Sequence, residues 1–329
     1  MTSGGTPAGV VVGFGGDGTT AEMLDWAAAE AATRGCPLRL LHVTPPPPPT
    51  DPYGFLVTDV EAMVGLRTDA ERRLRRALSR ARAIAPDIEV TARLAQGSVV
   101  PVLVDRARGA AMLVLGRGLR DERGLLRRSV SARVGSRAGC PVVVVGPSPA
   151  SPSGSPPRVV VGIDSAASCT GAVGFAFGAA RQRGIPLVAV QAWTPEPPAD
   201  LESITVPTAM AEMQARRTLD EALERWQTAY RDVSVHTAIV RGDPARVLQA
   251  QSRGAALLVV GTRGRRALQR TVFGSVSQAL LDQADCPLAI IHRGLPVVMP
   301  RLPGCGREPA GGDQPSPRGW PGRGRDVEG

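Results

Sequence analysis

The chain contains no lysine, and this absence excludes two kinds of chemistry. All of its 39 basic residues are arginines, and with 30 acidic residues they leave a formal net charge of +9. Without lysine there is no Walker A phosphate loop and no Schiff-base catalysis. The arginines are spread along the whole chain rather than gathered in one block, so we do not expect a nucleic-acid site.

Aromatic residues and long apolar runs are also scarce. Only 3% of the residues are aromatic, so the 43% that are hydrophobic predict aliphatic cores. No apolar run approaches the roughly 20 residues that cross a bilayer. The N-terminus, Met1–Gly5, lacks the basic and apolar regions of a signal peptide. We therefore expect a cytoplasmic protein with no membrane segment.

The cysteines are few and scattered, and no two of them form a C-x-x-C pair. This spacing argues against metal binding and dithiol redox chemistry. Cys140 and Cys286 each precede proline and an apolar run, so we expect them to be small buried residues. The five cysteines are Cys36, Cys140, Cys169, Cys286 and Cys305.

An internal repeat organises the sequence. Apolar segments recur at a spacing of 145 to 149 residues, for example Val10–Phe14 with Val159–Ile163 and Met112–Gly116 with Leu257–Gly261. We expect a first repeat at 9–146, a Pro/Ser-rich linker at 147–157 and a second repeat at 158–293. Residues 294–329 are rich in Pro, Gly and Arg, and this composition predicts disorder.

Each repeat alternates short, continuous apolar runs with helical patterns. Such runs are typical of parallel strands buried on both faces by helices. Each repeat is therefore predicted to be a doubly wound α/β unit with five strands and four helices. In the second repeat the predicted strands lie near 158–163, 186–192, 233–240, 256–261 and 287–292.

Several helices have recognisable starts or faces. The second repeat predicts a helix over Thr170–Arg183, another that begins after the N-cap Asp243, and a capping box at Ser275–Gln278. In the first repeat, apolar residues from Val60 to Ala81, Val64 among them, predict one buried helix face. The opposite, arginine-rich face favours a solvated surface, with Glu71 placed to pair with Arg75.

A glycine–serine pattern, Gly261-x2-Gly264-x9-Gly274-Ser275, follows a predicted buried strand of the second repeat. Gly264 and Gly274 would let the backbone approach a phosphate closely. Ser275 and Val276 would lie at a helix N-terminus, where free N–H groups and the helix dipole favour an anion. Each feature alone is ordinary, but together they favour a phosphate-binding loop.

The repeat unit resembles the universal stress protein family in its tandem two-domain form. The glycine–serine pattern looks like the ATP-binding motif of that family, and Asp164 after the first strand and Cys286-Pro287 support the match. The resemblance implies two flavodoxin-like (Rossmann-like) parallel sheets of order 3-2-1-4-5, related by a pseudo-twofold axis. It also implies ATP, with or without Mg²⁺, as the ligand, and the backbone of Ala192 near the base.

Asp164 would lie at the switch point of that strand order, where open α/β sheets bind their ligands. A carboxylate there could accept from a ribose hydroxyl or an adenine amino group, although an aspartate after a strand is also a common turn residue. Four flanking arginines would make the phosphate loop positive. They are Arg263, Arg265, Arg266 and Arg270.

The first repeat departs from the pattern. Gly15 replaces the aspartate, and the loop runs from Gly116 and Gly118 to Arg128 and Ser129, with Arg128 in the place of Gly274. A side chain now stands where backbone must approach phosphate, although Arg128 could itself offer a charge. We expect a degenerate nucleotide site.

The favoured function is an ATP-binding regulator or sensor in stress response rather than an enzyme. No catalytic residue is indicated, since His42, His236 and His292 fall in strand patterns, but slow ATP hydrolysis stays open. So do a nucleotide-independent scaffold, a homodimer and unidentified protein partners. A G-x-G-x-x-G stretch at Gly13–Gly18 lacks the acidic residue that a dinucleotide site needs after the second strand.

Overall fold

The computed structural model describes residues 8–15, 21–44, 60–118, 130–147, 156–194, 208–262 and 274–292. Most of the predicted linker and all of the predicted tail lie outside these ranges. In the first repeat, five strands alternate with four helices. They are β1 (Val10–Phe14), α1 (Ala21–Arg34), β2 (Leu38–Thr44), α2 (Val60–Ile84), β3 (Val90–Gln96), α3 (Val99–Arg106), β4 (Met112–Gly116), α4 (Val130–Gly135) and β5 (Val142–Val145).

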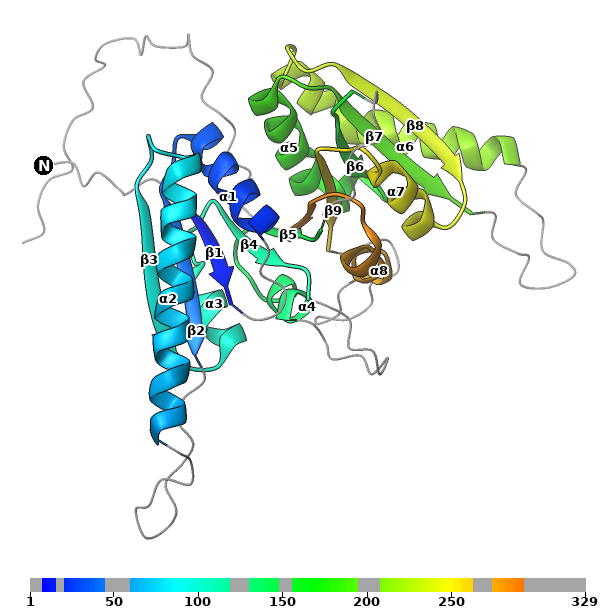
Figure 1. Ribbon diagram of the computed structural model, residues 1–329. Coiled ribbons are helices and arrows are strands. Elements are labelled where there is room, and N and C mark those ends of the chain that lie inside the picture. Colours follow the sequence, from blue (N-terminus) through cyan, green and yellow to red (C-terminus); the bar gives the residue numbers. More distant parts are fainter. Residues whose placement is uncertain are drawn as a thin grey trace, which may run out of the picture. The chain divides into compact units, whose positions relative to one another are not determined.

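The second repeat has the same order of elements (Figure 1). Each of its strands lies within two residues of the predicted bounds, and four of the five are apolar runs, whereas the edge strand near 233–240 is only partly buried. The elements are β6 (Val159–Gly162), α5 (Ala166–Arg183), β7 (Leu187–Trp193), α6 (Thr208–Ala229), β8 (Val235–Arg241), α7 (Pro244–Ser252), β9 (Leu257–Gly261), α8 (Ser275–Gln283) and β10 (Leu288–Ile291).

The strand order confirms the predicted topology and adds a junction between the repeats. The order β3-β2-β1-β4-β5-β10-β9-β6-β7-β8 contains 3-2-1-4-5 twice, the second time reversed. All pairs within a repeat are parallel, whereas β5 and β10 are antiparallel, with Ala289 opposite Val143 and Leu288 opposite Val144. Equivalent strands thus meet about a pseudo-twofold axis at Val143 and Ala289. The two predicted sheets are one ten-stranded sheet.

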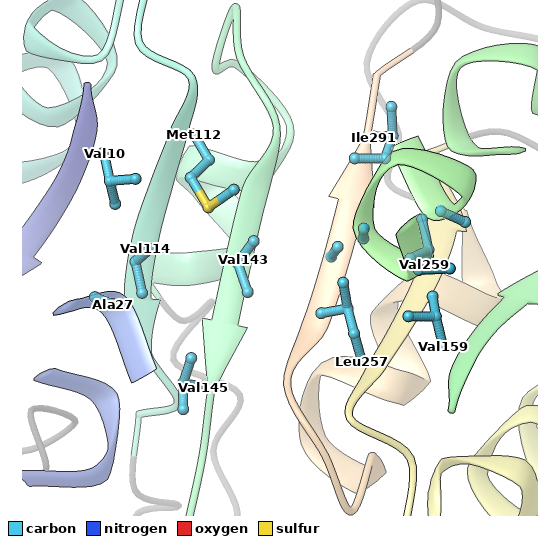
Figure 2. Packing of buried hydrophobic residues seen from close by; sticks show 14 of the residues in the cluster. Val10, Ala27, Met112, Val114, Val143, Val145, Val159, Leu257, Val259 and Ile291 are labelled. Carbon is cyan, nitrogen blue, oxygen red and sulfur yellow. The ribbon is translucent and has the colours of Figure 1, made fainter. Parts of the chain in front are cut away.

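Apolar side chains form one cluster on each face of this sheet, and both clusters run across the two repeats. Figure 2 shows part of the first cluster, with Val10, Met112 and Val114 of the first repeat and Val159 and Leu257 of the second. Helices α1, α2, α5 and α6 cover this face, and α3, α4, α7 and α8 cover the other. The cores are mainly aliphatic, as predicted.

One aromatic group interrupts this aliphatic core. Phe177 on α5 is fully buried, and its ring centroid lies 6.5 Å from that of Trp226 and 5.5 Å from that of Tyr230. At the equivalent positions the first repeat has only alanines, for example Ala28 in the place of Phe177. The two repeats share a backbone plan but fill their cores differently.

Two details of the helices were wrong in the sequence analysis. Helix α5 begins at Ala166, four residues before the predicted start, because its first turn is rich in Ser and Ala and has no apolar periodicity. Val64 on α2 does not belong to a buried face, since it is 60% exposed. Met210 and Met213 near the start of α6 are exposed as well, so these three apolar side chains lie beyond the core.

Candidate functional site

The carboxyl ends of β6 and β9 meet at the switch point in the second repeat. These two strands are parallel neighbours, and Val161 pairs with Val259. Asp164 therefore follows three residues beyond this pair on one strand, and Gly261 ends the other strand two residues beyond it. The chain leaves β6 through α5 toward β7 and leaves β9 through α8 toward β10, on opposite sides. A crevice for a ligand is expected at such a point.

The N-terminus of α8 is tied to the end of β9. The Gly274 N–H donates to the Thr262 carbonyl oxygen over 3.1 Å, and the buried Ser277 hydroxyl donates to the Gly274 carbonyl over 2.9 Å. Gly274 is the N-cap and Ser275 is the first helical residue, so the predicted capping box is wrong. The structure thus places Gly261, Gly274, Ser275 and Val276 at one end of the sheet. Gly264 and the four loop arginines lie outside the described residues.

A buried cysteine, which the sequence analysis left without a role here, holds the Asp164 turn. The Asp164 N–H donates to the Cys169 Sγ over 3.3 Å, and the Cys169 thiol is 3.9 Å from the Gly162 carbonyl oxygen. The thiol therefore links the end of β6 to the first turns of α5. In the sequence, this contact is indicated by a small apolar residue five positions after the aspartate.

Ala192 lies near the end of β7, one strand away from the switch point, where it pairs with Val240. The next turn is fixed, because the Gly242 N–H donates to the Trp193 carbonyl and the Arg246 N–H donates to Asp243, the predicted N-cap of α7. Beside Ala192, Gln191 is only 3% exposed and its Oε1 has no hydrogen-bond partner. Sequence reasoning missed this buried amide.

The first repeat differs at its switch point in backbone as well as in side chain. Gly15, the counterpart of Asp164, has a φ of +126°, which side-chain-bearing residues rarely adopt. A Cβ on Gly15 would fall 2.4 Å from the His42 ring. The His42 imidazole, at the position equivalent to Gln191, thus fills the space that an aspartate would need.

Arg117 follows the end of β4, on the other side of that switch point. It is the counterpart of Thr262, and its N–H likewise bonds to the neighbouring last strand, at the Val145 carbonyl. The Arg117 side chain lies so close to Gly146 that a Cβ there would fall 2.8 Å from Cζ. Arg117 lines a small surface hollow together with Ser131 of α4 and Asp282 of α8. Gly116 and Gly118 are described beside it, but Arg128 and Ser129 lie outside the described residues.

His42 should give the first repeat a pH dependence. Burial lowers the pKa of its imidazole below the usual 6.5, and the charge of Arg73 acts in the same direction against a contribution from the Phe14 backbone. The unfolded chain then binds this proton more readily than the folded one. The free energy of unfolding should fall as the pH drops below 6.5, by at most about 1.4 kcal/mol per pH unit.

His42→Gln, which copies Gln191, should remove this part of the pH dependence. Urea unfolding at several values between about pH 5 and 8 gives the free energy of unfolding as a function of pH. The slope of that plot should be steeper for the wild type than for the variant. Equal slopes in the two proteins would contradict the expectation, whatever the carboxylates contribute to both.

The described residues hold no group of three or more His, Cys, Asp or Glu side chains that could bind a metal ion. Cys36, Cys140, Cys169 and Cys286 are buried thiols outside any disulfide, and burial raises the pKa of Cys140 to about 11 and that of Cys286 to about 12. Within the same ranges, every helix is too short or too polar to cross a membrane.

Comparison with known proteins identifies relatives of the whole chain. The pattern of the universal stress protein family matches residues 9–146 and 157–292. Universal stress protein Rv2005c of Mycobacterium tuberculosis is 34% identical over 300 residues, which cover 87% of this chain and 97% of the relative. Universal stress protein Rv2623 of the same organism is 31% identical over 302 residues, which cover 90% and 100%.

A solved structure shares the fold over most of both repeats. It is a universal stress protein from Archaeoglobus fulgidus, with a TM-score of 0.63 and 17% identity over 88% of this chain and 98% of that chain. At this identity the likeness supports the fold alone. Because the family pattern matches both repeats and the relatives align over nearly their full length, the chain belongs to the universal stress protein family.

Proposed function

We propose that the second repeat binds ATP and that the protein acts as a nucleotide-dependent regulator in stress response. One observation carries the proposal: the Gly274–Thr262 hydrogen bond holds the N-terminus of α8 against the end of β9, beside the strand β6 that leads to Asp164. A helix N-terminus and a carboxylate on adjacent strand ends suit a ligand with phosphates at one end and hydroxyl or amino groups at the other.

The phosphates would bind at the first turn of α8. The N–H groups of Ser275, Val276 and Ser277 precede the first intrahelical bond, which Gln278 donates to Gly274. These donors and the helix dipole favour an anion, and the exposed Ser275 can add its hydroxyl. Mg²⁺, where present, would enter on the phosphates.

Binding rather than turnover is the expected role. The chain has no lysine to stabilise a transferred phosphoryl group. Asp164 follows a different strand from the one that leads to α8, so it suits the sugar or base end of the ligand better than the phosphate end. The bound nucleotide would then set a conformation that partner proteins recognise.

Mass spectrometry of nucleotide released from the purified protein, with stoichiometry per chain, tests the proposal. We expect one ATP or ADP per chain. Added ATP at about 100 times its Kd should raise the free energy of unfolding by about 2.7 kcal/mol. Two nucleotides per chain would assign a site to the first repeat as well. No nucleotide and no stabilisation would favour a nucleotide-independent scaffold.

A further inference from the structure

A buried ion cluster lies where the two repeats meet on the α1/α5 side of the sheet. Glu30 on α1 is only 3% exposed. One carboxylate oxygen accepts from Arg34 Nε over 2.6 Å, and the other accepts from Arg183 on α5. The two arginines are themselves mostly buried, with side chains 18% and 17% exposed. All three residues belong to the same compact unit, Met1–Val298.

The cluster breaks the pseudo-twofold symmetry. Arg34 and Arg183 are equivalent residues, since each ends its helix just before a glycine with positive φ, Gly35 at +59° and Gly184 at +62°. The position equivalent to Glu30 in the second repeat is Ala179. The interface between the two repeats at α1 and α5, called the seam below, therefore contains two matching guanidinium groups. It contains one carboxylate, which only the first repeat supplies.

The second repeat is built to receive that carboxylate. Burial disfavours the charged guanidinium of Arg183 and lowers its pKa, and the charge of Glu30 chiefly opposes this shift, so the buried cation is stabilised by its carboxylate partner. Its Nη1 donates to the Ala179 carbonyl over 3.0 Å, which holds the side chain toward the seam. The Arg34 guanidinium in turn lies 5.6 Å from the centre of the Phe175 ring on α5.

We propose that Glu30 makes this surface selective, so that the second repeat pairs with the first repeat of its own chain and rejects a second copy of itself. Two second repeats facing each other would bring two Arg183 side chains and two alanines together, with no carboxylate between them. A buried charge that has lost its partner costs far more than the pair contributes. The first repeat, with its altered nucleotide site, supplies the acidic half of the interface.

Substitutions at Glu30 in the full chain test the proposal. Glu30→Gln keeps the shape and removes the charge, and it should lower the Tm by at least ~5 °C. Hydrogen exchange should accelerate in β5 and β10 more than in β1 and β6, because the seam opens before the repeats unfold. The double variant Glu30→Arg with Arg183→Glu should recover more than half of the loss in Tm that the worse of its two single variants shows.

Asp25→Asn is the matched control. Asp25 also lies on α1 and pairs with an arginine, Arg80, at 2.5 Å, but both side chains are at least 40% exposed and both belong to the first repeat. We expect little change in Tm or exchange, as for other exposed pairs. If Glu30→Gln behaves like Asp25→Asn and the double variant recovers nothing, the proposal is wrong.

Selectivity has its own readout in Glu30→Arg, measured by analytical ultracentrifugation. This variant should form no dimer that the wild type does not form, and its seam should be open, because no copy offers a carboxylate to Arg183. Formation of a stable dimer through the second repeats would overturn the proposal even if the Tm falls as expected.

Discussion

Replacing Gly274 by arginine, the residue in the equivalent place of the first repeat, should weaken ATP binding at least about 100-fold and leave the protein folded. A Cβ on Gly274 would lie 3.1 Å from the Thr262 carbonyl oxygen, which already accepts the Gly274 N–H. The bond that holds α8 against β9 must therefore lengthen or tilt. The arginine side chain would then occupy the space in front of the first turn of α8. Gly274 has an extended backbone with φ of −61° and ψ of 145°, which any residue adopts, so the fold should survive.

Isothermal titration calorimetry with ATP measures this loss. Gly139→Arg is the control, because it also places an arginine at a glycine, but a Cβ there would meet nothing within 4 Å. The control should bind ATP like the wild type. An unchanged affinity in Gly274→Arg, together with an unchanged circular dichroism spectrum, would remove α8 from the nucleotide site.

Phe177→Ala should be the most destabilising single truncation in the second repeat, with a loss of about 3–5 kcal/mol in the free energy of unfolding. The ring is fully buried between α5 and the sheet and contacts Trp226 and Tyr230. Removing it leaves a cavity bordered by two rigid rings, which can collapse only partly. Urea unfolding followed by Trp fluorescence gives the midpoint and the m-value together.

Phe177→Leu is the companion variant, since it keeps most of the volume and should cost less than about 1.5 kcal/mol. A loss in Phe177→Ala no larger than that of Phe177→Leu would show that the core adapts around the missing ring. The first repeat has Ala28 at this position. Such adaptation would therefore mean that the core of the second repeat can pack around an alanine there, as the core of the first repeat does.

Most of the fold could be predicted because the strands are apolar runs buried on both faces. Val159–Gly162 and Leu257–Gly261 are short, continuous and bounded by polar or glycine residues, so their limits could be read directly. The order of the strands came from the family resemblance and not from periodicity. The joining of β5 and β10 could not be predicted, because two short aliphatic strands in separate repeats carry no signal for whether they pair.

Those residues of the candidate site whose position depends on the local sequence could be predicted. Asp164 and Gly274 stand directly beside a strand end and a helix start, so their places followed from the pattern. Arg117 and Glu30 could not be singled out in this way. Arg117 shares a hollow with Asp282 and Glu30 pairs with Arg183, each across more than a hundred residues, and in the sequence each is one more charged residue among many.

The junction of β5 and β10 also decides what a separated repeat would be. β5 is four valines, all buried, and β10 is Leu-Ala-Ile-Ile, also buried. In contrast, β8 at one outer edge of the sheet carries exposed polar residues such as His236 and Thr237. Parting the repeats by proteolysis would uncover flat apolar edges of the kind that recruit other chains into aggregates. Pairing of the two repeats therefore covers both edges, and a separated repeat is expected to aggregate more readily than the whole chain.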